Sequence, residues 1–314
     1  MRHVRPLRSQ LEGFDNAVRR GLRHLLKLPQ SATTALMHAP VSGGGLGLLP
    51  LTEQHEALQI AHAWQMLHSP DAAVRATARH QVRAICAKRH TLDADHWSAE
   101  REDELVSSFL NGTLASSPHA PPKRRNGDIG SLWVDVRRHL QTYELQLEPR
   151  DDNGTRLELQ LKVPHHRHWL SHRTVLRHIK LHLKLRHLDR WRSLSDQGRT
   201  VRTHGGAGAK FISTGGGLTD ADVRFAVNAR VNQLDTHATL KRRRLRANAT
   251  CRSPNCSRAE TLAHVLNHCP ANMDVIRQRH DQALEQIGAA IKKTPDVAGG
   301  HAELRLNATV PEPS

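Results

Sequence analysis

The stretch CRSPNCSRAETLAHVLNHC, residues 251–269, carries the strongest structural signal in the sequence. Its pattern is C-x4-C-x7-H-x4-C, and the four residues that define it are Cys251, Cys256, His264 and Cys269. Three thiolates and one imidazole make a closed tetrahedral shell, which Zn²⁺ prefers and which leaves no open position for a catalytic water. The pattern therefore predicts a structural zinc site in a small zinc knuckle, residues 250–270, that hardly folds without its metal.

The residues between these four suit the same site. The Ser-Pro-Asn triplet at 253–255 favours a tight turn between the first two thiolates, and residues 260–266 favour a short helix that presents His264. His268 is a rival for the fourth ligand position. Chance placement of three cysteines near a histidine, in a chain with many histidines, is the alternative interpretation.

Basic residues outnumber acidic ones along the chain. Lys and Arg total 46 against 30 Asp and Glu, which gives a formal charge of +16 before any of the 24 His takes up a proton. This excess attracts phosphate backbones through counterion release. An anionic membrane surface would respond to the same charge, but the sequence has no run of about 18 apolar residues and no signal-peptide core. We therefore expect a soluble intracellular protein that binds RNA and DNA and no membrane.

Two segments concentrate the charge. The first lies directly before the cysteines and consists of Lys241, Arg242, Arg243, Arg244 and Arg246. Beside a zinc module it is best interpreted as a phosphate clamp, with a nuclear localisation signal or a solvated run as alternatives. The second segment, residues 173–192, holds seven Lys or Arg and a single acid, Asp189, and is either a solvated face or a further phosphate contact.

Apolar periodicity predicts helices along most of the chain, and the scarcity of aromatic residues favours cores of Leu, Val, Ile and Ala. The expected helices cover residues 7–28, 52–67, 71–88, 131–140, 169–194, 219–233 and 274–292. The third of these helices should bury Val74, Ala78, Val82 and Ile85. Thr219 is the expected N-cap of the sixth, with Asp222 at the capping-box position. Cys86 lies far from the other cysteines in a helical stretch, which indicates a buried thiol rather than a disulfide framework.

The remaining segments are expected to be extended or irregular. Residues 116–128 are rich in Pro, Ser and charge and predict a linker. Residues 157–163 alternate apolar and polar side chains like a half-buried strand. Residues 169–194 fit both a strand and a helix, and their length favours the helix. The glycine clusters at 43–47 and 205–217 match no phosphate-binding pattern, so flexible turns are expected there.

Residues 220–281 resemble a known family. Their order is the segment 222–236, the basic run, the zinc pattern with residues 260–266 inside it, Cys269 followed by Pro270, and residues 277–281. It is similar to the C-terminal part of reverse transcriptases from site-specific non-LTR retrotransposons, which carry a restriction-like endonuclease and insert into ribosomal RNA genes. The segments 15–20, 26–29, 38–40 and 44–47 resemble the thumb region of the same family. With gaps the resemblance covers nearly the whole chain, although residues 90–215 match only loosely.

The resemblance implies a nucleic-acid-binding fragment of an RNA-directed DNA polymerase, which grips template RNA and target DNA for target-primed reverse transcription in the nucleus. The family's Arg-x-Asn-x-Leu-Pro-Thr motif corresponds to Arg230, Asn232 and Thr236, with Asp235 in place of the proline. An acid beside a phosphate path would weaken binding. With these three, the expected nucleic-acid-binding residues are the five of the basic run together with Arg279 and His280.

The resemblance also implies the division of the chain. We expect a mainly α fold with a thumb-like helical domain at 1–90, a flexible linker at 91–130 and a basic helical linker domain at 131–249. The zinc knuckle at 250–270 and the incomplete start of an α/β endonuclease domain at 271–314 complete the expected order. The remainder of the polyprotein, with its fingers, palm and endonuclease, would then be a partner of this chain.

Catalytic residues are not expected within the chain. Reverse transcription needs paired aspartates for two metal ions, yet Tyr143 is followed by Glu-Leu and Phe225 by Ala-Val. Fingers and palm would precede Met1, and the endonuclease signature would follow the last residue. The alternative is a metal-dependent nuclease that uses Asp296 and Glu303, and a third possibility is a host zinc-binding adaptor.

Overall fold

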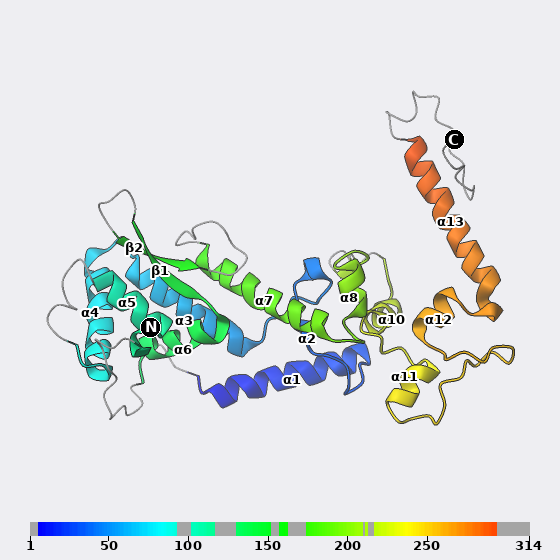
Figure 1. Cartoon of the computed structure of the whole chain (residues 1–314), viewed down its shortest axis with the longest axis horizontal. Coiled ribbons are helices and arrows are strands. Elements are labelled where there is room, and N and C mark those ends of the chain that lie inside the picture. The colour runs from blue at the N-terminus through cyan, green and yellow to red at the C-terminus, as the bar shows by residue number, and fades with distance from the viewer. Residues whose placement is uncertain are drawn as a thin grey trace. The chain divides into compact units, whose positions relative to one another are not determined.

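The computed structural model describes residues 6–92, 102–116, 130–151, 157–162, 174–209, 211–212 and 217–293 (Figure 1). Of the expected flexible linker at 91–130, residues 93–101 and 117–129 lie outside these ranges. Residues 102–116 are helical and bury Val106 and Phe109, so the prediction of a flexible linker is wrong for this part. Asp296 and Glu303, which the nuclease interpretation needs, also lie outside them, as does everything expected of the endonuclease domain beyond residue 293.

The described chain is mainly helical, as the sequence predicts. Its elements are α1 (Arg8–Leu26), α2 (Ala35–His38), η1 (Val41–Gly43), α3 (Leu51–Leu67), α4 (Ala72–Arg89), α5 (Glu102–Asn111), η3 (Thr113–Ser116), α6 (Leu132–Tyr143), β1 (Gln146–Asp151), β2 (Leu157–Lys162), α7 (Val175–Ser193), α8 (Arg199–His204), α10 (Asp220–Arg230), α11 (His237–Arg242), α12 (Leu262–Asn267), η4 (Pro270–Asn272) and α13 (Met273–Lys292). The contacts between residues divide the chain into two compact units, residues 1–224 and residues 225–314.

The expected strand at 157–163 exists as β2 and pairs antiparallel with β1. β1 was not predicted, and its register sets Pro149 opposite Leu159. The segment that fitted both helix and strand forms the helix α7. The expected capping box is present at the start of α10. The Thr219 hydroxyl donates to the Asp222 carboxylate over 2.6 Å and accepts from the Asp222 N–H over 3.3 Å.

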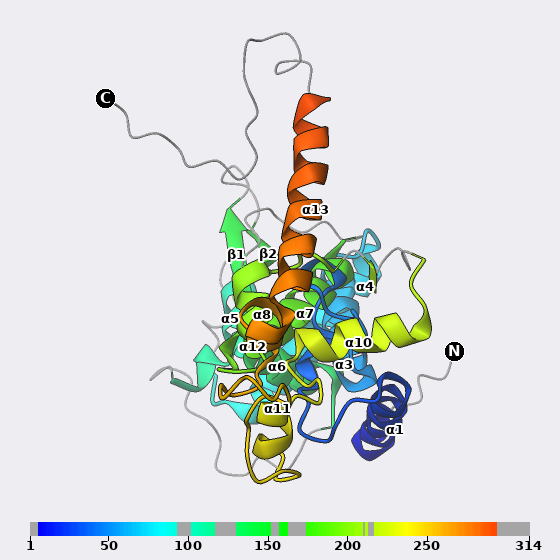
Figure 2. The same cartoon turned by 90° about the vertical axis from the view of Figure 1, so that its right-hand side faces the viewer.

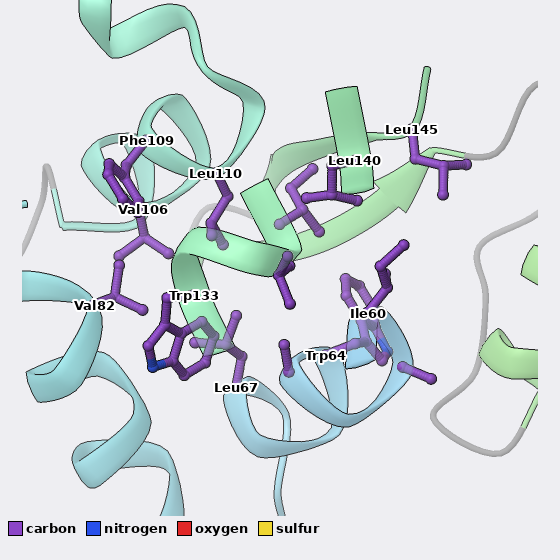
Figure 3. Packing of buried hydrophobic residues seen from close by; sticks show 14 of the residues in the cluster. Ile60, Trp64, Leu67, Val82, Val106, Phe109, Leu110, Trp133, Leu140 and Leu145 are labelled. Carbon is purple, nitrogen blue, oxygen red and sulfur yellow. The ribbon is translucent and has the colours of Figure 1, made fainter. Parts of the chain in front are cut away.

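The core of the first unit is built by α3, α4, α5, α6, β1 and α7. Figure 3 shows side chains from α3 to α6 pointing toward one another, among them Trp64, Val82, Phe109 and Trp133. Trp133 is 1 % exposed, and its indole N–H donates to the Gln81 side chain over 3.0 Å. Burial of such large apolar side chains is the main stabilising term of a unit of this kind.

One expected core residue of the first unit lies at the surface. Val74 was expected in the core but is 39 % exposed, because the buried face of α4 begins only with Ala78. The apolar residues of α1 do not all meet the core either, since Phe14 is 54 % and Leu25 is 57 % exposed. Helical spacing identified these helices but not how much of each apolar face is covered.

A buried carboxylate attaches α1 to α3. Asp15 accepts hydrogen bonds from the backbone N–H groups of Leu51 and Thr52, over 2.6 and 3.1 Å, and from the Thr52 hydroxyl over 2.8 Å. These N–H groups belong to the first turn of α3, where no intrahelical acceptor exists. Asp15 of α1 therefore caps the N-terminus of α3, which begins after Pro50.

Single glycines of both clusters lie against neighbouring backbone, whereas Gly205 and Gly208 have open space around them. A Cβ atom on Gly45 would lie 2.3 Å from the Ala39 carbonyl oxygen. A Cβ on Gly206 would lie 1.8 Å from the Ser42 carbonyl oxygen, so the second cluster contacts the backbone beside the first. Gly44 and Gly47 adopt φ angles of 84° and 71°, which side-chain-bearing residues rarely do.

Candidate metal centre

A short hairpin positions the first two cysteines. Thr250 pairs with Ala259 in an antiparallel bridge, and the Cys251 N–H donates to the Arg258 carbonyl over 2.8 Å. At the tip the Cys256 N–H donates to the Ser253 carbonyl over 3.1 Å, which closes the turn expected at 253–255. The hairpin therefore brings both thiols to one side of a tight loop.

The other two residues of the cluster come from the helical segment that follows. The Thr261 hydroxyl caps α12 by accepting from the His264 N–H over 3.0 Å, which fixes the first turn of the helix and the histidine in it. Cys269 precedes η4, whose first residue is Pro270. The short helix expected at 260–266 is α12, which begins at Leu262 and contains His264.

The four side chains converge as the spacing predicts. Their candidate ligand atoms all lie within 4.8 Å of one another, and all four residues are buried. The sulfurs of Cys251 and Cys269 are 3.9 Å apart, and the Cys256 sulfur lies 3.3 Å from Nε2 of His264. With Zn–S bonds of about 2.3 Å and Zn–N bonds of about 2.0 Å, a tetrahedral ion separates its ligands by about 3.8 Å for S···S and about 3.5 Å for S···N.

This geometry matches a metal site better than its alternatives. A sulfur separation of 3.9 Å is far longer than the roughly 2.05 Å of a disulfide bond, and all four cysteines are free. His268 is exposed and is not one of the four clustered residues. The chain thus has a buried Cys3His cluster that could hold a metal ion such as zinc. Cys86 is the expected buried thiol, and burial raises its pKa to about 12.

A buried glutamate, which the sequence analysis did not single out, joins the hairpin to α11. Glu260 accepts from the Arg252 backbone N–H over 2.8 Å and from two nitrogens of its guanidinium over 2.9 and 2.7 Å. It also accepts from the His237 N–H over 3.0 Å, and its own carbonyl accepts from the Ala238 N–H over 3.1 Å. The Arg252 hydrogen bond is the main reason why the pKa of Glu260 falls to about 2.

The sequence contains one sign of the role of Glu260: it is an acid that directly precedes the Thr261 cap in a strongly basic region. In the structure its side chain is 1 % exposed. Carboxylates are almost never fully buried without a partner. The two N–H groups that Glu260 satisfies belong to the first turn of α11, so the hairpin that carries Cys251 and Cys256 shares one hydrogen-bonded network with α11.

The basic run begins in α11 and leaves it at Arg243. Lys241, Arg244 and Arg246 are exposed. The Arg242 guanidinium donates to the Thr239 hydroxyl over 3.0 Å. Arg243 forms an ion pair with Asp235, with 2.6 Å between Nη1 and Oδ1. The run therefore presents several cations to solvent while two of its arginines also contact the protein.

The segment expected to be the Arg-x-Asn-x-Leu-Pro-Thr counterpart is mostly built into the fold. Arg230 is 7 % exposed, and burial lowers the pKa of its guanidinium. Asn232 adopts a left-handed φ of 51° just after α10. Thr236 is buried and caps α11 by accepting from the Thr239 N–H over 3.3 Å. Contacts of these three residues with nucleic acid stay a prediction.

The last helix is attached to the cluster region by an arginine. Figure 2 shows α13 as one continuous helix that follows α12. The Arg279 guanidinium donates to the Leu266 carbonyl over 2.6 Å and to the Asn267 side chain over 3.1 Å, at the C-terminal end of α12. His280 is exposed and contacts Asp281 over 3.1 Å. Of these two expected nucleic-acid-binding residues, Arg279 already has a structural role.

Comparison with known proteins adds no family to these observations. We found no protein-family model and no curated protein that matches the chain. Among the described helices, none has the length and apolar character needed to cross a membrane. Function is therefore inferred from the chemistry of the cluster and of the basic residues beside it.

Proposed function

We propose that residues 225–293 form a zinc-stabilised module that binds nucleic acid. One observation carries the proposal: Glu260 joins the hairpin of the Cys3His cluster to the first turn of α11, and α11 leads into the exposed basic run. A metal ion that orders the hairpin would thereby also order the segment that presents the cations. The function of a closed metal site without catalytic activity would then be to hold the basic run in place.

Zinc is the metal that suits the cluster best. Thiolate-rich tetrahedral sites with one imidazole are typical of structural Zn²⁺, and a closed shell supplies folding energy rather than catalysis. Harder cations such as Mg²⁺ and Ca²⁺ prefer oxygen ligands. We infer one tightly bound structural zinc ion per chain, held by Cys251, Cys256, His264 and Cys269.

The exposed cations would contact phosphates. Lys241, Arg244 and Arg246 project from or beside α11 without an acidic partner among the described residues. Such contacts position a protein on RNA or DNA and depend steeply on salt, but they carry little sequence information. The module would therefore grip nucleic acid, and selection of a site would fall to other parts of the assembly.

The sequence resemblance suggests what that assembly is. We propose that the chain belongs to a non-LTR retrotransposon polyprotein and grips template RNA and target DNA in the nucleus. Polymerisation and DNA cleavage would then be performed by the remainder of the polyprotein. The order of motifs in residues 220–281 supports this part of the proposal, and residues 1–90 would correspond to the thumb.

The salt dependence of binding tests the proposal. The double variant Lys241→Gln with Arg244→Gln removes two exposed charges of the basic run, and Arg20→Gln with Arg199→Gln removes two exposed charges of the first unit. We expect the first pair to reduce the slope of log affinity against log salt by about 0.9 per lost phosphate contact on duplex DNA, and the control pair to leave it unchanged. Fluorescence anisotropy over a salt series measures both. Equal slopes for the two double variants would contradict the proposal.

A further inference from the structure

The first unit contains a polar cavity that the zinc module does not involve. It has a volume of about 300 Å³ and lies between α1, α3, α6 and α7, whose arrangement Figure 1 shows. Its charged lining consists of Arg8, Glu53, Glu56, Arg138, Arg186 and Arg190. Ligand pockets begin at about this size, and they usually hold a few fixed polar groups.

Fixed hydrogen bonds hold the two carboxylates of the lining. The His187 ring donates from Nε2 to Glu53, 2.9 Å from each carboxylate oxygen, and the Tyr143 hydroxyl donates to Glu56. The side chains of Glu53 and Glu56 are only 22 % and 12 % exposed. These carboxylates are therefore fixed parts of the wall rather than mobile surface acids.

The arginines are held to different degrees. Arg186 donates to the Thr142 carbonyl over 2.7 Å, and its guanidinium lies 5.4 Å from the centre of the Tyr143 ring. Arg8 contacts Glu56 over 3.4 Å. Arg138 reaches Asp135 only at 3.9 Å. The Arg190 side chain makes no hydrogen bond or ion pair with any described residue, so its guanidinium is available to a ligand.

Charge and geometry together indicate the class of ligand. Four arginines against two glutamates leave the lining with two excess positive charges when its histidines are neutral. Guanidinium groups bind phosphate through paired, charge-assisted hydrogen bonds. Carboxylates without arginines beside them would repel such an anion. A phosphate monoester carries about −1.5 to −2 charges at pH 7 and would balance this excess.

We propose that this cavity binds a phosphate monoester, carried either by a nucleotide or by the phosphorylated end of a nucleic-acid strand. The phosphate would lie between Arg186 and Arg190, on successive turns of α7, in a cavity that Arg138 of α6 also lines. The site lies wholly within the first unit and does not depend on zinc or on the basic run.

Calorimetric titration of the full-length chain with adenosine monophosphate, and with adenosine as the control, tests the site. We expect the monophosphate to bind and adenosine not to bind. Arg190→Gln should weaken binding roughly tenfold or more, because one charge-assisted pair of hydrogen bonds is lost. Arg20→Gln removes an equal charge from an exposed position of α1 outside the cavity and should leave the affinity unchanged.

Two further arms separate the possible sources and the two proposals. A 5′-phosphorylated oligonucleotide that binds more tightly than its unphosphorylated form, with a difference that Arg190→Gln abolishes, would identify a strand end; no such difference would identify a free nucleotide. The Lys241→Gln and Arg244→Gln double variant should bind the monophosphate as the wild type does. The proposal is overturned if millimolar adenosine monophosphate does not bind, or if Arg20→Gln weakens its binding as much as Arg190→Gln.

Discussion

The two units of the chain are stabilised by different means. The first buries a continuous cluster of large apolar side chains, including Trp64, Phe109 and Trp133. In the second, the buried apolar residues within the described range 225–293 are Val227, Val231 and the three cysteines of the cluster. Polar residues such as Glu260 and His264 are buried there instead.

This difference shows how much a small unit depends on directed interactions. Burial of apolar area contributes about 25 cal/mol per Å² and needs no special geometry, so the first unit tolerates modest changes of side chain. A small unit with few buried apolar groups needs metal ligation or an equivalent constraint. The second unit should therefore respond sharply to the loss of single ligands or hydrogen bonds.

Loss of the metal should have the largest effect. Zinc removal by a strong chelator, or Cys256→Ser, should abolish the structure of residues 250–270 and leave the first unit folded, because structural zinc contributes on the order of 10 kcal/mol to such knuckles. Hydrogen exchange would locate the loss, and elemental analysis would measure the metal. Cys86→Ala, at a buried thiol far from the cluster, is the control and should keep the full zinc content. Purified protein without zinc would contradict the expectation.

Truncation in the apolar core should have the next largest effect, and it should destabilise the first unit rather than the second. Trp133→Ala should lower the free energy of unfolding of the first unit by about 3 to 5 kcal/mol, without changing the zinc content. Phe14→Ala removes an aromatic ring that is 54 % exposed and should cost well under half as much. Chemical denaturation followed by tryptophan fluorescence or circular dichroism measures both. Equal costs would show that the cluster around Trp133 is not the core that stabilises the unit.

Removal of the buried carboxylate should weaken the metal site indirectly. Glu260→Gln loses the charge-assisted hydrogen bonds to Arg252, and we expect zinc affinity to fall by roughly one to two orders of magnitude. The pKa of Glu260 is lowered on folding, so its contribution is complete above about pH 5 and disappears as the pH falls toward 2. Competition titration at pH 7 therefore measures the full effect.

Arg252→Gln is the matched partner of that substitution. The effects of Glu260→Gln and Arg252→Gln should be clearly less than additive in the double variant, because both remove the same pair. Additive effects would assign the role of the Glu260 carboxylate to its hydrogen bonds with the backbone N–H groups of His237 and Arg252.

The smallest effect concerns the acid next to the basic run. Asp235→Asn frees Arg243 from an ion pair whose aspartate is 70 % exposed, so stability should change by less than about 1 kcal/mol. Under the proposed function, affinity for RNA or DNA should rise a few-fold, with a salt slope steeper by up to about one contact. Asp189→Asn, which frees Arg192 in the first unit, is the control. An unchanged affinity for Asp235→Asn would exclude Arg243 from the interface.

Local patterns predicted most of the helices and the four clustered residues. The Cys3His spacing and the Thr219 capping box lie within short stretches, where sequence distance limits spatial distance. What the sequence did not reveal depends on contacts between distant segments. Asp15 caps a helix that begins 36 residues later along the chain, and β1 exists only because β2 pairs with it. The buried state of Arg230 likewise follows from tertiary packing.

The compact spacing of the four clustered residues also has a consequence for the rate of folding. All four lie within residues 251–269, and the hairpin that holds two of them needs closure of only a short loop. Loops of this length close in well under a microsecond and hairpins form within microseconds, whereas the first unit must unite residues as distant as Leu49 and Leu183. During refolding, the knuckle should therefore take up zinc at a rate limited by the supply of metal, before Trp133 reaches its buried position.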